Sequence, residues 1–176
     1  MIIGESKRFA IEFQVSEPHD WLLDGRLCYL VGGARVGDFE IISSLNIALA
    51  QFRQIVKLSG NRYDHSLYEK PAAEAFSEIY NALHDDDSRS NSQIDEDNIV
   101  YGRFRADISL YSFDYWPCFV VEADEAARFL WICLNDPSKE VHAQKLVSSE
   151  FDDVVKRFID YMSAHYSAEL GDRRNI

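Results

Sequence analysis

The sequence predicts an α+β fold: an antiparallel β-sheet, meander-rich in its second half, with about three helices packed mainly on one face. Three observations support this prediction. An early segment alternates between apolar and polar residues, three segments repeat apolar residues at helical spacing, and short apolar runs separated by turn residues follow late in the chain. Because 176 residues suit one core, we expect a single domain over residues 1–170 and a frayed tail over 171–176.

Strands are expected at the start of the chain. Residues 7–15 alternate in polarity, which predicts a strand with one buried face and one wet face. The buried face would consist of Phe9, Ile11, Phe13 and Val15. Residues 26–31 predict a second strand that ends at Gly32 and Gly33, and a short third strand over 35–41 would complete a hairpin through that turn.

Three helices are expected from capping residues and apolar stripes. Ser43 or Ser44 would cap the first helix, which ends at Gly60. Pro71 fits the first turn of the second helix, and Ser149 would cap the last, whose first turn is acidic. The three stripes are Leu45, Ala48, Leu49, Phe52, Ile55 and Val56; Ala75, Phe76, Ile79, Tyr80 and Leu83; and Phe151, Val154, Val155, Phe158, Ile159 and Met162.

Between the second helix and the late strands lies a strongly polar segment, residues 84–98. Its one apolar residue is Ile94, so we expect it to be a mobile acidic surface loop within the domain. After it, apolar runs with short turns predict antiparallel strands that form a meander. The expected strands are 99–112, 117–122, 127–134 and 139–147.

The composition excludes several classes of protein. The formal net charge is -12, and charged or polar residues interrupt every apolar run, so no membrane span is expected. The first residues do not resemble a signal peptide. Three cysteines without C-x-x-C spacing favour reduced, buried thiols over disulfides or structural zinc. We therefore expect a cytoplasmic protein.

No motif predicts a catalytic, metal or cofactor site. The chain lacks a G-x-S-x-G elbow, a phosphate-binding glycine loop and an H-E-x-x-H helix, and its five histidines form no H-x-H pair. Cys28 lies in a strand context, where a buried thiol is commoner than a nucleophile. Carboxylates are abundant, but abundance alone does not make a converging acid–base pair. We expect no enzyme activity, no catalytic residues, no metal and no cofactor.

Nucleic-acid binding is also disfavoured. Arg103 and Arg105 with Tyr101 could suggest a base-stacking platform on a strand. The acidic residues around them would cancel the attraction for phosphate, so local ion pairs are the commoner explanation.

The stretch with the best claim to a binding role combines acids with aromatic residues. Residues 84–136 hold 12 Asp and Glu against four Lys and Arg, a combination that suits a surface for a basic protein. The candidate residues are Asp85, Asp86, Asp87, Asp95, Glu96 and Asp97 for electrostatic steering, and Tyr111, Asp114, Tyr115 and Trp116 as anchors. The alternative is that the acids are only solvated. Phe119, Phe129 and Trp131 are expected in the core, because they fall in apolar strands.

The chain resembles the immunity protein 42 family, whose members belong to bacterial polymorphic toxin systems, the group that protects a cell against toxin domains delivered by contact with neighbouring cells. The resemblance rests on Ile2-Ile3-Gly4, Phe9-Ala10-Ile11-Glu12, Trp21, Gly25-Arg26-Leu27-Cys28-Tyr29, Gly37-Asp38-Phe39-Glu40, the strand with Trp131 and the helix with Phe151. These motifs are structural, so the resemblance implies a role but no site. Many such toxins are nucleases with a basic cleft, which an acidic inhibitor can block by mimicking phosphate.

The resemblance implies a monomeric or weakly homodimeric immunity protein that binds one cognate toxin domain. This toxin would be a basic protein such as a nuclease, and the immunity protein would block its active site or its access to substrate. Two alternatives remain open. The chain could be an interaction or regulatory module for another basic protein or a small ligand, or an enzyme with an unrecognised acidic, metal-assisted site.

Overall fold

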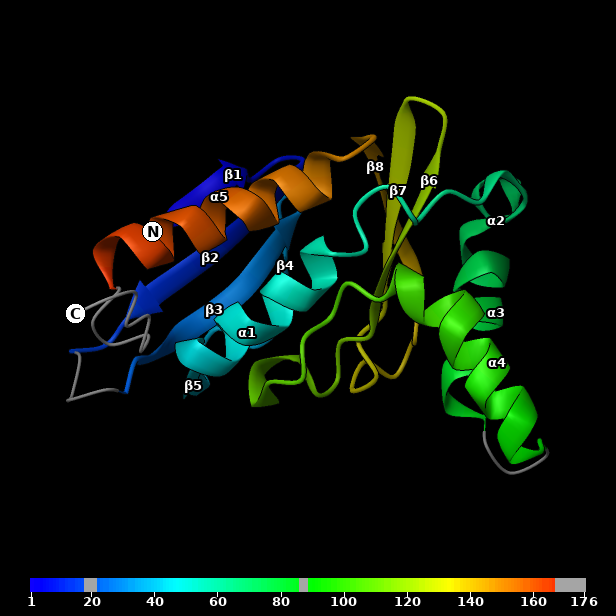
Figure 1. The fold of residues 1–176 in the computed structure, drawn as a ribbon, viewed down its shortest axis with the longest axis horizontal. Helices are drawn as coiled ribbons and strands as arrows, with labels where there is room; N and C mark the ends of the chain where they lie inside the picture. Colours follow the sequence, from blue (N-terminus) through cyan, green and yellow to red (C-terminus); the bar gives the residue numbers. More distant parts are fainter. Residues whose placement is uncertain (18–21, 86–88, 167–176) are drawn as a thin grey trace. The chain divides into compact units, whose positions relative to one another are not determined.

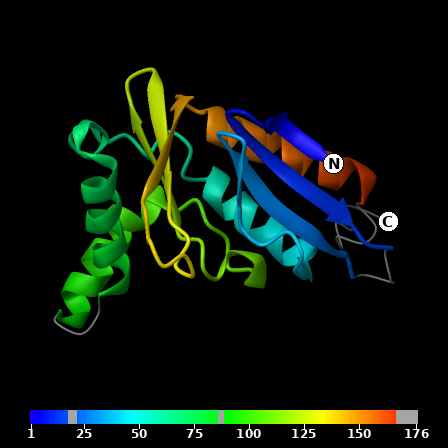
Figure 2. The same cartoon turned by 180° about the vertical axis from the view of Figure 1, so that it is seen from behind.

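The computed structural model describes residues 1–17, 22–85 and 89–166 (Figures 1 and 2). The chain divides into two compact units, which are described separately. Unit 1 consists of Met1–Lys57, Ile108–Asp114 and Glu150–Ile176, and unit 2 consists of Leu58–Asp107 and Tyr115–Ser149. Both units combine an antiparallel sheet with helices, which confirms the α+β class. The expectation of one domain over residues 1–170 stays a prediction, and the expected tail at 171–176 lies outside the described residues.

Unit 1 is built on a five-stranded antiparallel sheet. Its strands are β1 (Ile2–Glu5), β2 (Phe9–Val15), β3 (Asp24–Val31), β4 (Ala34–Val36) and β5 (Ile42–Ser44). They are ordered β1-β2-β3-β4, and β5 also pairs with β3, through Asp24 opposite Ser44. The predicted hairpin through Gly32 and Gly33 is confirmed, although β4 is shorter than predicted.

Two helices cover one face of this sheet, α1 (Leu45–Val56) and α5 (Glu150–His165) (Figure 1). The alternation in β2 puts Phe9 and Phe13 against them, with the Phe9 ring 5.0 Å from the Phe151 ring and the Phe13 ring 5.0 Å from the Phe158 ring. Five of the six residues of each predicted apolar stripe are buried, while Val56 and Ile159 are partly buried. Ser44 is the N-cap residue of α1, without a side-chain capping bond.

Gly25 shows why β3 and α1 can pack so closely. A Cβ atom at this position would lie 2.3 Å from the Gln14 carbonyl oxygen and 2.7 Å from Cδ1 of Leu45. Any side chain would therefore push β3 away from β2 or from the first residue of α1. The glycine fixes where α1 begins relative to the sheet.

Unit 2 contains the predicted meander, β6 (Cys118–Ala123), β7 (Ala126–Trp131) and β8 (His142–Val147), in the order β6-β7-β8. Its helical elements are α2 (His65–Glu69), α3 (Ala72–His84), α4 (Asn91–Tyr101) and the 3-10 turn η1 (Gly102–Phe104). Ile79 of α3 packs with Phe119 and Leu130 of the sheet in one buried cluster. Phe119, Phe129 and Trp131 are buried, as predicted.

Two sequence predictions in this region are wrong. Residues 91–98 belong to helix α4 instead of a loop. The expected strand over 99–112 is replaced by the end of α4, by η1 and by the 3-10 turn η2 (Tyr111–Phe113). The turn η2 belongs to unit 1. A capping box explains the helix: the Ser90 side chain accepts the Gln93 N–H, and the Gln93 side chain accepts the Ser90 N–H. The described residues therefore form five α-helices where about three were expected.

Among the residues that the structure describes, no helix combines the length and the apolar character that crossing a membrane requires.

Candidate interaction site

The acidic half of the predicted surface lies around helix α4. Asp95 and Glu96 are exposed on α4, and Asp85 is exposed directly after α3. Asp97 forms an ion pair with Arg89, which also donates to the Ala82 carbonyl oxygen at the end of α3. The remaining two residues of the predicted set, Asp86 and Asp87, lie outside the described residues.

Helix α4 is unusual because none of its residues is buried. Ile99 is 80% exposed and Val100 is 42% exposed, whereas Tyr101 at the end of the helix is partly buried against the core of unit 2. Its capping box and the Arg89–Asp97 pair hold its first turns, and the Tyr101 hydroxyl donates to Glu78 of α3 at 3.3 Å. Asp95 and Glu96 can therefore present charge to solvent without disturbing a core.

The predicted aromatic anchors divide between the two units. Tyr111 and Asp114 belong to unit 1, whereas Tyr115 and Trp116 belong to unit 2. The Tyr115 side chain is 52% exposed while its carbonyl oxygen accepts the Leu134 N–H. Trp116 is half-buried, and its carbonyl oxygen accepts a hydrogen bond from the Cys118 thiol at 3.1 Å. Tyr111 is 75% exposed and is the most accessible of these aromatic residues.

Residues 108–114, here called the inserted turn, are held in unit 1 by contacts with distant parts of the sequence. Gln51 of α1 accepts the Ser109 N–H through its side-chain oxygen and donates to the Ser109 carbonyl oxygen. The Asp38 N–H donates to the Ser112 carbonyl oxygen at 2.7 Å, and the buried Phe113 ring lies 4.8 Å from the Tyr29 ring. These bonds fix the turn that carries Tyr111 and Asp114.

Gly37 allows the inserted turn to approach the chain after β4. Its φ is +105°, a conformation that L side chains rarely adopt. A Cβ atom there would also lie 3.2 Å from the Ser112 carbonyl oxygen and 3.2 Å from Cε1 of Phe113. Gly37 therefore meets two requirements: it adopts the positive φ, and it leaves room for the inserted turn.

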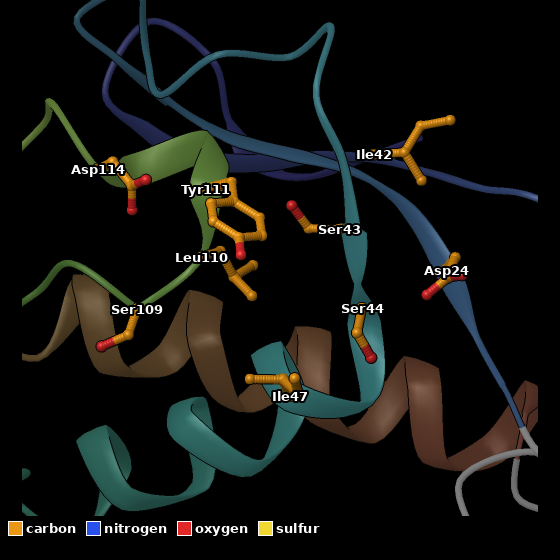
Figure 3. Close-up of a pocket in the computed structure, with 9 residues that line it drawn as sticks. All are labelled: Asp24, Ile42, Ser43, Ser44, Ile47, Ser109, Leu110, Tyr111 and Asp114. Atoms are coloured by element: carbon orange, nitrogen blue, oxygen red, sulfur yellow. The ribbon is translucent and has the colours of Figure 1, made fainter.

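A pocket of about 490 Å³ opens between the inserted turn, β5 and the start of α1 (Figure 3). It is lined by Asp24, Ile42, Ser43, Ser44, Ile47, Ser109, Leu110, Tyr111 and Asp114. Leu110 is buried, whereas Ile42 is 57% and Ile47 is 51% exposed. The pocket thus has apolar walls that are open to solvent, which is a common feature of binding surfaces.

The polar groups of the pocket are acidic or neutral. Asp24 and Asp114 contribute carboxylates at opposite ends, and none of the described lining residues is basic (Figure 3). Ser43 is 7% exposed, and its buried hydroxyl has no hydrogen-bond partner in the part of the chain that the structure describes. A buried hydroxyl without a partner is costly, so a ligand that donates a hydrogen bond would satisfy it.

Sequence reasoning found two of the pocket residues, Tyr111 and Asp114, but not the others. Asp24, Ile42, Ser43 and Ile47 were missed because β5 is only three residues long and was not predicted as a strand. Pairing of β5 with β3 brings Ser44 opposite Asp24, a contact that no local pattern reveals. The one available signal was the apolar Ile42 beside serines that suggest a helix start.

Two buried thiols and the metal-ligating side chains of the described residues give no sign of a reactive centre. Burial, and next the Glu12 carboxylate, raise the pKa of the Cys28 thiol to about 12, so this thiol is not a nucleophile near neutral pH. Burial also raises the pKa of Cys118 well above its usual value, and all three cysteines are free. Among the described residues, no group of three or more His, Cys, Asp and Glu could hold a metal ion.

Arg103, one of the two basic residues that suggested nucleic-acid binding, is engaged within unit 2. Arg103 forms an ion pair with Asp64 at 3.3 Å and lies over the Phe104 ring. This confirms the predicted ion pair for Arg103, although Arg103 belongs to η1 instead of a strand.

Comparisons with known proteins give two matches. The model of the immunity protein 42 family matches residues 1–161. CdiI from Burkholderia dolosa, a crystal structure, is similar with a TM-score of 0.71 at 23% sequence identity, over 92% of this chain and 99% of that chain. At this identity the likeness concerns the fold alone. No curated protein matches the sequence significantly.

Proposed function

Since the chain belongs to the immunity protein 42 family, we propose that it neutralises one cognate toxin domain by forming a stoichiometric complex that blocks the toxin's active site or its access to substrate. The single observation that carries this proposal is the family match over residues 1–161. Membership itself makes the chain a toxin-neutralising inhibitor whose partner is a toxin, and not an enzyme.

The charge of the chain supports a basic toxin. A formal net charge of -12 attracts a basic domain over a distance of about one Debye length and disfavours binding to nucleic acid directly. A toxin with a phosphate-binding cleft, such as a nuclease, would fit this charge. We propose that the complex forms in the cytoplasm with one copy of each partner, and that the inhibitor is a monomer or a weak homodimer when free.

In this proposal, two groups of residues contribute to different steps of binding. Asp95 and Glu96 on α4, with Asp85, Asp86, Asp87 and Asp97, increase the association rate by steering. Tyr111, Asp114, Tyr115 and Trp116 anchor the toxin and slow its dissociation. The exposure of Asp95 and Glu96, and the 75% exposure of Tyr111, support this division. The pairing of Asp97 with Arg89 leaves that carboxylate less available than the others.

A growth-rescue assay tests the proposal. The toxin domain encoded by the gene immediately upstream is induced in a sensitive strain, with and without this chain. We expect normal growth only in its presence, together with a one-to-one complex on size-exclusion chromatography. Continued growth arrest with both proteins soluble, and no complex between them, would contradict the proposed pairing.

The association kinetics test the electrostatic part separately. We expect the association rate constant to fall steeply between about 0.01 and 0.3 M salt, because ions screen attraction between opposite charges. Rescue with an association rate that does not depend on salt would keep the immunity role and remove the basic toxin.

A further inference from the structure

We infer that the pocket of unit 1 receives an arginine side chain of the toxin, which becomes a central contact of the complex. This inference rests on the proposed function, because it names the chemistry by which the partner is recognised. It assigns a binding role to Ser43, Ile42 and Ile47, and it places Tyr111 and Asp114 in one site.

The walls of the pocket fit the apolar part of an arginine. Ile42 and Ile47 are both more than half exposed, and Leu110 forms a buried part of the lining. The three methylene groups of an arginine would cover these side chains and remove apolar surface from water. Tyr111, which is 75% exposed, offers a ring face on which a planar guanidinium can stack.

The polar groups fit the charged end. The Ser43 hydroxyl is directed into the space between β5 and Tyr111, and it has no partner among the described residues (Figure 3). A guanidinium has five N–H donors, which are enough for this hydroxyl and for a charge-assisted bond to the Asp114 carboxylate. Asp24 at the other end of the pocket adds a second negative charge.

Other occupants fit these groups less well. An anionic side chain or a phosphate would meet two carboxylates and no basic residue among the described lining residues. A purely apolar side chain would fill the walls but leave the Ser43 hydroxyl without a partner. A lysine ammonium matches the charge, but it is compact and strongly hydrated and cannot stack as a plane.

The site is built before the partner arrives. The side chain of Gln51 and the backbone of Asp38 hold the inserted turn, and β5 is paired with β3. Binding of a partner side chain therefore costs little conformational entropy in the pocket. This contact can then contribute a large share of the binding free energy.

A titration without the toxin tests the pocket by itself. The full chain, with labelled isoleucine methyl groups and tyrosine rings, is titrated with N-acetyl-arginine amide and followed by NMR. We expect saturable shifts of the Ile42, Ile47 and Tyr111 signals in the millimolar range. The neutral isostere N-acetyl-citrulline amide should bind at least about fivefold more weakly, because it lacks the charge that the carboxylates attract. No saturable shift, or equal or tighter binding of the citrulline or lysine amide, would overturn the inference.

Two serine variants test the hydroxyl in the complex. Ser43→Ala should leave the melting temperature unchanged or higher, because it removes a buried hydroxyl that has no partner, and yet weaken toxin binding about fivefold or more. Ser112→Ala is the matched control, since its hydroxyl is likewise buried and without a partner among the described residues but does not line the pocket. Equal binding by both variants would overturn the role of Ser43.

Two further variants, each with a control, test the carboxylate and the apolar wall of the pocket. Asp114→Asn and Ile47→Ala should each weaken toxin binding on the order of tenfold. Asp160→Asn on the exposed side of α5, and Ile2→Ala on β1 at the opposite edge of the sheet, should change it less than about twofold. If the unaltered chain binds no toxin, the proposed function fails, while the NMR titration still decides about the pocket. If the unaltered chain rescues growth and the pocket variants bind as tightly, the pocket inference fails alone.

Discussion

Helix α4 and the inserted turn come from the same acid-rich, aromatic stretch of sequence, yet they are held in opposite ways. No residue of α4 is fully buried, and the helix is held by its own capping box, by Arg89 and by the Tyr101 hydroxyl, which donates to Glu78 of α3. The inserted turn has only seven residues, of which Ile108, Leu110, Ser112 and Phe113 are buried, and it is bonded to Asp38 and Gln51. One region carries charge on a lightly attached helix, whereas the other carries an exposed tyrosine on a fixed frame.

This difference explains why the two regions suit different parts of binding. Long-range attraction depends on where charge lies and tolerates movement of the carboxylates, so a helix without a buried face can provide it. A central contact depends on geometry and gains affinity from a rigid frame, so it needs the packing that the inserted turn has. Four predictions test the comparison, in decreasing order of their effect on the free energy of unfolding.

The largest expected effect is that of Phe113→Ala. The Phe113 ring is 3% exposed and packs on Tyr29, so its removal should lower the free energy of unfolding by about 3–5 kcal/mol. Ile99→Ala on α4 is the matched change, and it should cost less than about 0.5 kcal/mol because Ile99 is 80% exposed. Urea unfolding of both variants measures the difference. Similar costs would mean that α4 is packed more tightly than its exposure indicates.

Gly37→Ala should have the next largest effect. It places a Cβ atom at a positive φ and 3.2 Å from the Ser112 carbonyl oxygen, so we expect a loss of about 1–3 kcal/mol. Gly33→Ala is a useful control, because its φ is also positive but a Cβ atom there would meet nothing within 4 Å. Thermal unfolding should therefore show a greater loss for Gly37→Ala. An equal loss would assign the whole effect to backbone strain and none to contact with the inserted turn.

Ser90→Ala should have a smaller and more local effect. It removes the side chain that accepts the Gln93 N–H at the start of α4, which costs about 1 kcal/mol where a helix unfolds with its unit. Because α4 has no buried residue, we expect it to fray separately. Hydrogen exchange should then accelerate in residues 91–101 while the melting temperature of the chain hardly changes. A clear fall in the melting temperature would show that α4 belongs to the cooperative core.

The sequence predicted those elements whose signal is local. The stripes of α1, α3 and α5 and the alternation of β2 follow from burial on one face, and the meander follows from short turns between apolar strands. Helix α4 was missed because its residues lack an apolar stripe, although Ser90 and Gln93 form a capping box that can be recognised in the sequence.

The pocket could be predicted only in part, for a physical reason. Tyr111 and Asp114 were predicted because they are an aromatic and an acidic residue near a turn. Their neighbours in space, Ser43 and Ile47, are more than 60 positions away in the chain and reach them through the pairing of β5 with β3 and through the bonds of Gln51. Such contacts depend on the whole of unit 1, so no window of sequence contains them.

The smallest effect on stability is expected for charge reversal on α4, where the effect on binding kinetics should be clear. Asp95→Lys combined with Glu96→Lys changes two exposed side chains and should alter the free energy of unfolding by less than about 0.5 kcal/mol. If these acids steer the toxin, the association rate constant at low salt should fall about tenfold and depend less on salt, while the dissociation rate changes little.

The matched control for α4 is Glu5→Lys combined with Glu140→Lys, since both glutamates are exposed and the change in net charge is the same. Stopped-flow measurements from low to physiological salt compare the two double variants. A similar slowing in both would mean that the total charge of the chain attracts the toxin wherever the acids lie. A slowing confined to the α4 variant would assign steering to this helix. The dissociation rate would then depend on the contacts of the inserted turn, because electrostatic steering acts before the partners touch.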